Sequence, residues 1–494
     1  MKIKYLLLPV FLFLQFSLTA GGYFKWTPQA RTAYAQIIEL RLTDAEQTVK
    51  RLKVSEPDNL IILHLENYID FFKVFINEDK AEFDRLEANK DRRLELIKKG
   101  DSYSPYCLYL QADIRLQWAL ARLKFEEYAT AFFETNKAFK LLDENSRRFP
   151  NFMANKKDLG ILHAMVGTIP DNYKWLVETL TSMEGSIDQG TKELRSVVNF
   201  SRNHDFIYET ETYVFYSYLM LHLGNDEDTA WSLINESNLQ PQKSPLAAFI
   251  KANIAMRTDR NDQAVQILLN RPQGAGYTSF PYLDYMLGTA KAARLDKDAD
   301  VYFKAYLRDF KGRNFIKDTY RRLAWHELIH DNRAGWYQYM QKVKTEGYTV
   351  VGSDESALKE AESGDLPDTA LLKARLLFDG GYYAQAYDVL IKKPVSNYAD
   401  ARYLLEHNYR MGRILHKMKD YPEALNYYDK TIALGRDAVW YFACRAALEK
   451  GRIYEAARDK TAAETAYREC ISIKPEEHRT GLHQAAKAGL SRVR

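Results

Sequence analysis

One short segment, residues 325–330, carries side chains that bind metal ions at a spacing that suits zinc. It reads Trp-His-Glu-Leu-Ile-His, which places His326 and His330 four positions apart, with Glu327 between them. On a helix, residues four apart lie on one face, so both imidazoles can reach the same zinc ion. The glutamate would then be the general base that activates a water molecule. A zinc-dependent metallohydrolase is therefore one interpretation of this sequence.

A catalytic zinc site needs features that the rest of the sequence does not supply. In one class of zinc proteases a glycine and a further histidine follow the motif, whereas this chain has Arg333 and Trp336 there. The third-ligand pattern of another class is absent around the nearest downstream carboxylates, Glu355, Glu360 and Glu362. No sheet edge that would align a substrate is predicted. We therefore predict an ordinary helix here, with no catalytic residue, no metal ion and no cofactor.

The composition favours helices and argues against nucleic acid as a partner. Of the 494 residues, 46% are apolar, which is enough to fill a core, while only 23 are Gly and 14 are Pro. Scarce helix breakers favour long helices over a fold that is rich in loops. The formal net charge is only +4. A nearly neutral chain has no broad cationic field, so we predict no nucleic-acid partner.

The first 22 residues have the pattern of a secretory signal peptide. Lys2 and Lys4 precede an apolar run over residues 5–18, and small residues follow at positions 19–22. The run is shorter than the roughly 20 residues that a transmembrane helix needs. We therefore predict an exported protein, periplasmic or associated with the cell envelope, with no transmembrane span after the signal is removed. An uncleaved anchor is the alternative.

The C-terminal third contains a repeated pattern of small and aromatic residues. A glycine is followed twelve positions later by an alanine, and four positions after that by a tyrosine, in two successive units. A small residue on each helix of a pair lets the two backbones approach closely, the ring fills the groove beside them, and a proline ends the second helix. The markers of the two units are Gly412, Ala424, Tyr428, Gly451, Ala463, Tyr467 and Pro475. The chain here resembles the tetratricopeptide repeat family.

Similar spacing between small residues can be followed towards the N-terminus. The markers there are Ala374 with Ala386, Ala252 with Ala264 and, in a slipped form, Gly288 with Ala299. The resemblance implies an all-α fold, a right-handed superhelix of helix-turn-helix repeats in which each unit buries its apolar face against its neighbours. An insertion interrupts the series. It contains the only plausible strand, residues 348–351, and a short helix from Ser353 onward.

These patterns predict the order of parts along the chain. Three Thr-Pro or Ser-Pro pairs, at Thr27, Ser104 and Ser244, are typical of helix N-caps. The predicted parts are a signal peptide (1–22), a degenerate helical-repeat region (23–200), middle repeats (201–345), the insertion (346–368), C-terminal repeats (369–475) and a capping helix (476–494).

Cysteine usage gives no disulfide framework. The chain has three cysteines, and their odd number and spacing are typical of small buried core residues. Cys444 and Cys470 fall on neighbouring predicted helices, so a bond between them stays open.

The repeats predict a binding protein rather than an enzyme. Helical-repeat superhelices bind extended peptides or partner helices along their concave surface. We therefore predict a non-enzymatic exported scaffold for a protein or peptide partner, with the metallohydrolase and an envelope glycan-binding protein as alternatives. The 34 tyrosines are compatible with glycan binding. The candidate binding residues surround the least regular repeat and are Trp325, His326, Glu327, His330, Trp336 and Tyr337.

Overall fold

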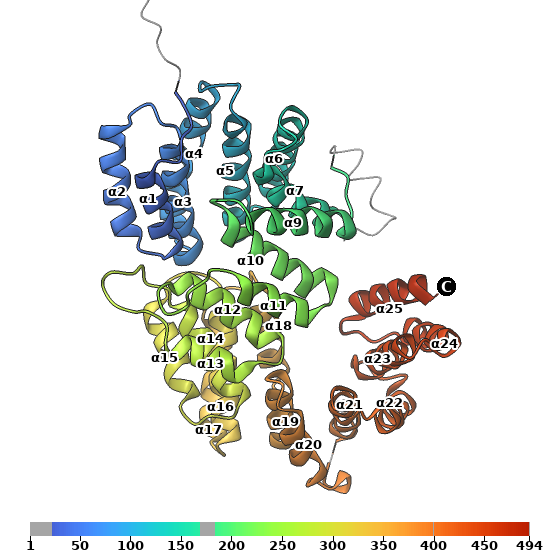
Figure 1. Ribbon diagram of the computed structural model, residues 1–494. Coiled ribbons are helices and arrows are strands. Elements are labelled where there is room, and N and C mark those ends of the chain that lie inside the picture. Colours follow the sequence, from blue (N-terminus) through green and yellow to red (C-terminus); the bar gives the residue numbers. More distant parts are fainter. Residues whose placement is uncertain (1–21, 168–182, 399, 494) are drawn as a thin grey trace, which may run out of the picture.

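The chain folds into helices arranged as a right-handed superhelix of helix pairs (Figure 1). The computed structural model describes residues 22–167, 183–398 and 400–493. Within those residues there is no strand, and the only β-type pairing is an isolated bridge between Tyr23 and Asn59. The predicted signal peptide lies, except for Gly22, outside the described residues. The all-α prediction is confirmed.

The N-terminal helices stand side by side, as the blue to green part of Figure 1 shows. Helices α1 and α5 begin where the sequence predicts, because Thr27 and Ser104 cap them and a proline follows each cap. The helices are α1 (Pro28–Ile38), α2 (Leu42–Ser55), α3 (Ile61–Asn77), α4 (Lys80–Lys98), α5 (Pro105–Leu123), α6 (Tyr128–Arg148), α7 (Met153–Val166), α9 (Ile187–Ser201) and α10 (Glu209–Leu219), which runs on into the π-helix η1 (Met220–Gly224).

The middle helices continue the series, and the side chain of Ser244 caps α12 as predicted. They are α11 (Glu227–Glu236), α12 (Pro245–Arg257), α13 (Asn261–Leu269), α14 (Tyr282–Ala293), α15 (Ala299–Asp309), α16 (Ile316–Ile329), α17 (Arg333–Thr345) and α18 (Gly352–Ser363). The helix expected in the insertion is confirmed as α18. The strand expected at residues 348–351 is wrong, because no partner strand lies beside this segment and it runs as an irregular connection into α18.

The C-terminal helices form an arm that Figure 1 shows beside the body, in brown to red. They are α19 (Thr369–Asp379), α20 (Tyr383–Ile391), the 3₁₀ helix η2 (Val395–Asn397), α21 (Ala401–Lys417), α22 (Tyr421–Gly435), α23 (Phe442–Ala456), α24 (Lys460–Ser472) and α25 (Arg479–Val493). We call residues 401–493, which hold α21–α25, the C-terminal arm. Helix α25 ends the arm with one buried side against α23 and α24.

The repeat markers lie where two helices of a pair cross. A Cβ atom added at Gly451 would lie 2.4 Å from the ring of Tyr467, and one at Gly412 would lie 2.7 Å from the ring of Tyr428. Only glycine allows these approaches, because any side chain would displace the ring or the helix. The remaining markers are also buried, and they are Ala252, Ala264, Gly288, Ala374, Ala386, Ala424, Ala463 and Pro475.

The cysteines are free thiols in the structure. Cys444 and Cys470 are fully buried on α23 and α24, with their Sγ atoms 3.6 Å apart. The Cys444 thiol also donates to the Cys470 carbonyl oxygen at 3.4 Å. Their proximity follows from the close approach of the paired helices.

Candidate partner-binding surface

The His-Glu-x-x-His segment lies at the end of α16, and its polar atoms are engaged in fixing that end. His326 Nε2 donates to the carbonyl oxygen of Lys297 at 3.0 Å. His330 Nδ1 donates to the carbonyl oxygen of His326 at 2.8 Å. The carboxylate of Glu327 accepts a hydrogen bond of 2.7 Å from Asn332, the N-cap residue of α17. His326 and Glu327 therefore join α16 to its neighbours, and His330 bonds back to α16 itself.

The surroundings of these histidines do not supply further ligands. The nearest carboxylate oxygen to His326 Nε2, on Asp300, lies 3.9 Å away. Within the part of the chain that the structure describes, no group of three potential ligand side chains is placed to hold a metal ion. Burial lowers the pKa of His326, which keeps the ring neutral at physiological pH. We conclude that this segment serves helix packing in the structure.

Two of the expected binding residues, Trp325 and Trp336, are buried, and this corrects the prediction that they form a contact surface. Their exposed fractions are 3% and 1%. The insertion explains the burial of Trp325, because Glu360 on α18 accepts a hydrogen bond of 2.6 Å from the indole nitrogen. Arg375 on α19 lies over the same ring, 4.7 Å from its centroid. Of the expected residues, Tyr337 is the most exposed aromatic, at 54%.

A buried cluster of charged side chains lies at the start of α16. Asp318 is fully buried and accepts hydrogen bonds from Tyr285 Oη at 2.5 Å and Arg322 Nε at 2.6 Å. Burial raises the pKa of Asp318, but the guanidinium groups of Arg322 and Arg321 outweigh it and hold the pKa below its usual range. Asp354 on α18 accepts from the backbone amide of Asp318 at 2.9 Å. The charged side chains at the start of α16 are therefore paired with one another inside the protein.

The inner face of the N-terminal helices is filled as well. Lys157 of α7 is fully buried, and its Nζ atom lies 2.7 Å from Glu211, 2.8 Å from Asp158 and 3.7 Å from Asp113. Aromatic rings enclose the cluster, and the ring of Tyr208 lies 5.0 Å from the lysine nitrogen. These residues come from α5, α7 and α10, so one buried lysine links three helices. A partner cannot enter here without displacing buried side chains.

The C-terminal repeats, from α19 onward, carry an arginine at one recurring position. Arg375, Arg413 and Arg452 each directly follow the first small marker of their repeat, so they occupy the same position in three successive units. We call these three residues the arginine row. The guanidinium carbon of Arg413 lies 4.2 Å from the ring centroid of Phe378 on the preceding unit. This row was not predicted from the sequence. The pattern that could have indicated it is a small residue followed by arginine in three consecutive units.

Two members of the row touch no carboxylate directly, although, against the effect of burial, Glu449 and Asp379 are among the negative groups whose charge raises the pKa of Arg413. Among the described residues, Arg375 and Arg413 form no ion pair and no hydrogen bond, and each instead lies over an aromatic ring. Arg452 pairs with Glu449 at 3.0 Å. Neighbouring arginines are paired too, since Arg410 pairs with Glu406 on its own helix. The row thus holds two cations whose hydrogen-bonding groups are free.

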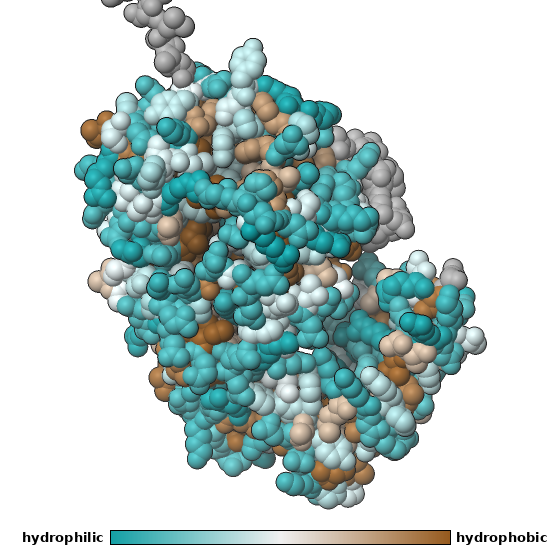
Figure 2. Space-filling view, viewed as in Figure 1, coloured by the Kyte–Doolittle hydropathy of each residue, from teal (hydrophilic) through white to brown (hydrophobic). Residues whose placement is uncertain are grey.

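The row lies on helices that line a hollow. Figure 1 places α21 and α23 on the side of the C-terminal arm that faces the body, with α22 and α24 outside. Figure 2 shows the surface hollowed between the arm and the body, with hydrophilic residues along its edges. The arm contacts the body through Lys417, whose Nζ lies 3.3 Å from Asp259, and just before α20 the Oη of Tyr382 donates to Asp262 at 2.8 Å. Two members of the row, Arg413 on α21 and Arg452 on α23, therefore belong to the helices that face this hollow.

Comparison with known families identifies the unit that carries the end of the row. The family model for the tetratricopeptide repeat matches residues 445–477. Residues 445–477 form a tetratricopeptide repeat. This repeat comprises most of α23, all of α24 and the turn that follows. A tetratricopeptide repeat is typically a non-catalytic scaffold, and it supports a role in protein interaction.

Comparisons with whole proteins add little. No curated protein matches the chain. Among solved structures, one match is the "Crystal structure of APC/C hetero-tetramer Cut9-Hcn1", at 11% identity and a TM-score of 0.26, covering 95% of this chain and 96% of that one. Another is the "Structure of Naa15/Naa10 bound to HypK-THB", at 13% identity and a TM-score of 0.25, covering 94% and 65%. TM-scores this low support no argument about shared shape or function.

None of the described helices is both long and apolar enough to cross a membrane.

Proposed function

We propose that this chain is an exported scaffold that binds an acidic segment of a protein partner in the cell envelope. The observation that carries the proposal is the pair Arg375 and Arg413, two cations at equivalent positions of successive repeats that form no direct ion pair or hydrogen bond with the described residues. A planar guanidinium donates two parallel hydrogen bonds to one carboxylate, so each arginine suits an Asp or Glu side chain of a partner. Stacking over an aromatic ring fixes each guanidinium before binding and lowers the entropy cost of the contact.

The envelope location rests on the N-terminal sequence. The basic residues, short apolar run and small residues of positions 1–22 are typical of a signal peptide. Fractionation of the cells that make the full chain, with mass spectrometry of its N-terminus, tests this part. The expected result is a chain in the envelope fraction that lacks about 22 residues. A cytoplasmic chain that retains Met1 would contradict export.

The partner can be captured by a photo-crosslinking amino acid placed at Asp379, which is exposed at the end of α19 beside the arginine row. The control position is Lys430, which is exposed on α22, the outer helix of its pair. We expect a discrete crosslinked protein from position 379 and none from position 430. Equal products from both positions, or none from either, would contradict binding at the concave face.

A charge-reversal variant tests the chemistry of the contact. Hydrogen bonds to charged groups are worth roughly 1.5–3 kcal/mol each. Arg375→Glu combined with Arg413→Glu is therefore expected to reduce the crosslinked product from position 379 by at least about tenfold. The matched control, Lys430→Glu, reverses a charge on the outer surface and is expected to leave the product unchanged. If the double variant gave as much crosslinked product as the unmodified chain, the arginine row would have no role in binding the partner.

A further inference from the structure

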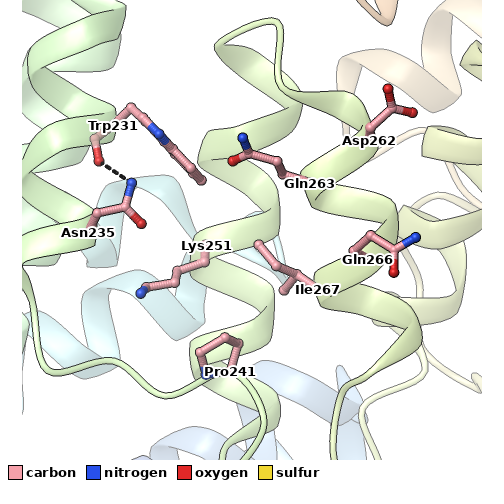
Figure 3. A pocket seen from close by; sticks show the side chains of 8 residues that line it. All are labelled: Trp231, Asn235, Pro241, Lys251, Asp262, Gln263, Gln266 and Ile267. Carbon is pink, nitrogen blue, oxygen red and sulfur yellow. Dashed lines mark hydrogen bonds between the residues drawn. The ribbon is translucent and has the colours of Figure 1, made fainter.

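A second hollow lies among α11, α12 and α13 of the middle repeats and has no part in the function proposed above. It has a volume of about 420 Å³, within the range of small-molecule sites. Figure 3 shows Trp231 and Asn235 projecting from α11, Gln263 and Ile267 from α13, and Lys251 from the helix between them, α12. Three consecutive helices thus contribute to one opening.

The tryptophan in this hollow is held in place. Arg260 lies over the indole, with its guanidinium carbon 5.4 Å from the ring centroid. That arginine is itself fixed by Asp228, whose carboxylate lies 2.9 Å away, and by the carbonyl oxygen of Thr258 at 2.6 Å. A ring fixed before binding loses little entropy when a ligand packs against it. Trp231 therefore forms a rigid apolar wall.

The polar groups of the hollow are free. Lys251 is half-buried and forms no ion pair or hydrogen bond with any described residue. Burial lowers its pKa, as expected for an ammonium group without a counter-ion. Asn235 Nδ2 donates to the carbonyl oxygen of Trp231 at 2.9 Å, which leaves its side-chain oxygen available. The amides of Gln263 and Gln266 make no hydrogen bond with described side chains.

We propose that this hollow binds an acidic sugar residue. The indole of Trp231 packs against the C–H face of the sugar ring, and the equatorial hydroxyls project from the edge of that ring. Lys251 pairs with the carboxylate, which compensates a cation that is partly removed from water. The side-chain amides of Asn235, Gln263 and Gln266 each offer a donor or an acceptor to the ring hydroxyls. An apolar ligand would take these exposed amides and the ammonium group away from water without offering them a partner, and a neutral sugar would leave the ammonium group without an anion.

The probe that tests the proposal is methyl β-D-glucuronide, added to the full chain and followed by saturation-transfer NMR. For a ligand of about 14 non-hydrogen atoms, typical binding efficiencies correspond to a dissociation constant of about 1 mM. The two comparison probes are methyl β-D-glucoside, which lacks the carboxylate, and benzoate, which lacks the hydroxyls. We expect saturation transfer to the glucuronide and at least about tenfold weaker binding of both comparison probes.

Variants assign the binding to this hollow. Lys251→Gln replaces the half-buried cation with a neutral, polar side chain. It is expected to weaken glucuronide binding at least about tenfold. Lys243→Gln makes the same chemical change at an exposed residue of the preceding loop and is expected to have no effect. Circular dichroism shows that each variant is folded.

Three outcomes would overturn the proposal. The first is no saturation transfer to the glucuronide at millimolar concentration. The second is glucuronide binding that Lys251→Gln leaves unchanged, which places the ligand elsewhere. The third is benzoate binding as tight as glucuronide binding, which makes the hollow a site for aromatic acids rather than sugars.

Discussion

Glu78 Oε2 accepts hydrogen bonds from the backbone amide and the side-chain amide of Asn314, at 3.0 and 2.7 Å, across 236 positions of the sequence. The same oxygen accepts from the backbone amide of Arg313 at 3.2 Å, and Lys124 donates to the other carboxylate oxygen at 2.8 Å. Glu78 is buried and terminates α3 in a left-handed conformation. One carboxylate therefore joins the N-terminal helices to the turn between α15 and α16.

This joint predicts that Glu78→Gln uncouples the two halves of the molecule. The glutamine side chain lacks the negative charge to which Lys124 and three N–H groups donate in the unmodified protein. Breaking a buried pair typically costs about 3–5 kcal/mol. We expect a loss of this order in the free energy of unfolding by urea, with faster proteolysis near residues 311–315. The matched control is Glu126→Gln, which removes the exposed partner of Arg313 at 3.1 Å and should cost less than about 1 kcal/mol. Similar losses in the two variants would contradict the joint.

The close helix crossing at Gly451 predicts a strong effect of one methyl group. Gly451→Ala would place a Cβ atom 2.4 Å from the ring of Tyr467, and overpacking of this kind costs about 1–3 kcal/mol. Gly481→Ala is the control, because nothing lies within 4 Å of its Cβ position on α25. Alanine is favoured over glycine in an open helix by about 1 kcal/mol. Thermal unfolding should therefore show a lower Tm for the first variant and an equal or higher Tm for the second.

The buried cluster around Lys157 predicts a dependence of stability on pH. Burial raises the pKa of Asp158 to about 7, assisted by the charges of Asp113 and Glu211 and opposed by Lys157. Since the pKa in the unfolded chain is near the ordinary 3.8, the folded state holds more protons between these values. The contribution of Asp158 to stability is therefore fully present below about pH 4 and is lost as the pH rises through about 7.

The variant Asp158→Asn isolates this contribution, because an amide does not titrate. One pKa unit corresponds to about 1.4 kcal/mol, so the effect amounts to at most about 4 kcal/mol. We expect the free energy of unfolding of the unmodified chain to fall, relative to the variant, between about pH 4 and pH 7. A difference between the two proteins that stays constant over this range would show that Asp158 is charged throughout.

The packing of α16 predicts that the His-Glu-x-x-His segment retains no stoichiometric zinc. His326 donates to the Lys297 carbonyl oxygen and Glu327 is held by Asn332, so metal binding would have to break both contacts. After incubation with zinc and desalting, metal analysis should give well below one zinc per chain, both for the unmodified protein and for His326→Ala. One zinc per chain that disappears in His326→Ala would restore the metallohydrolase interpretation.

Local features of the fold were predictable from the sequence, because they depend on near neighbours in the chain. The caps at Thr27, Ser104 and Ser244 follow from a hydroxyl before a proline. The spacing from Gly451 to Tyr467 indicated a helix pair, since a ring can lie against a small residue only when two helices cross closely. These relationships repeat along the chain, and repetition makes a weak local signal recognisable.

Only the tertiary structure decided which side chains remain available to a partner. Trp325 looked like an exposed anchor, but the insertion brings Glu360 onto its indole and buries it. Lys157 and its carboxylates form one buried cluster, although they are spread from residue 113 to residue 211. Arg375 and Arg413 make no direct contact with a carboxylate of the described residues, although the charges of Glu449 and Asp379 act on Arg413. Burial and charge pairing depend on contacts between distant segments, and the curvature of the superhelix, which no single repeat encodes, determines those contacts.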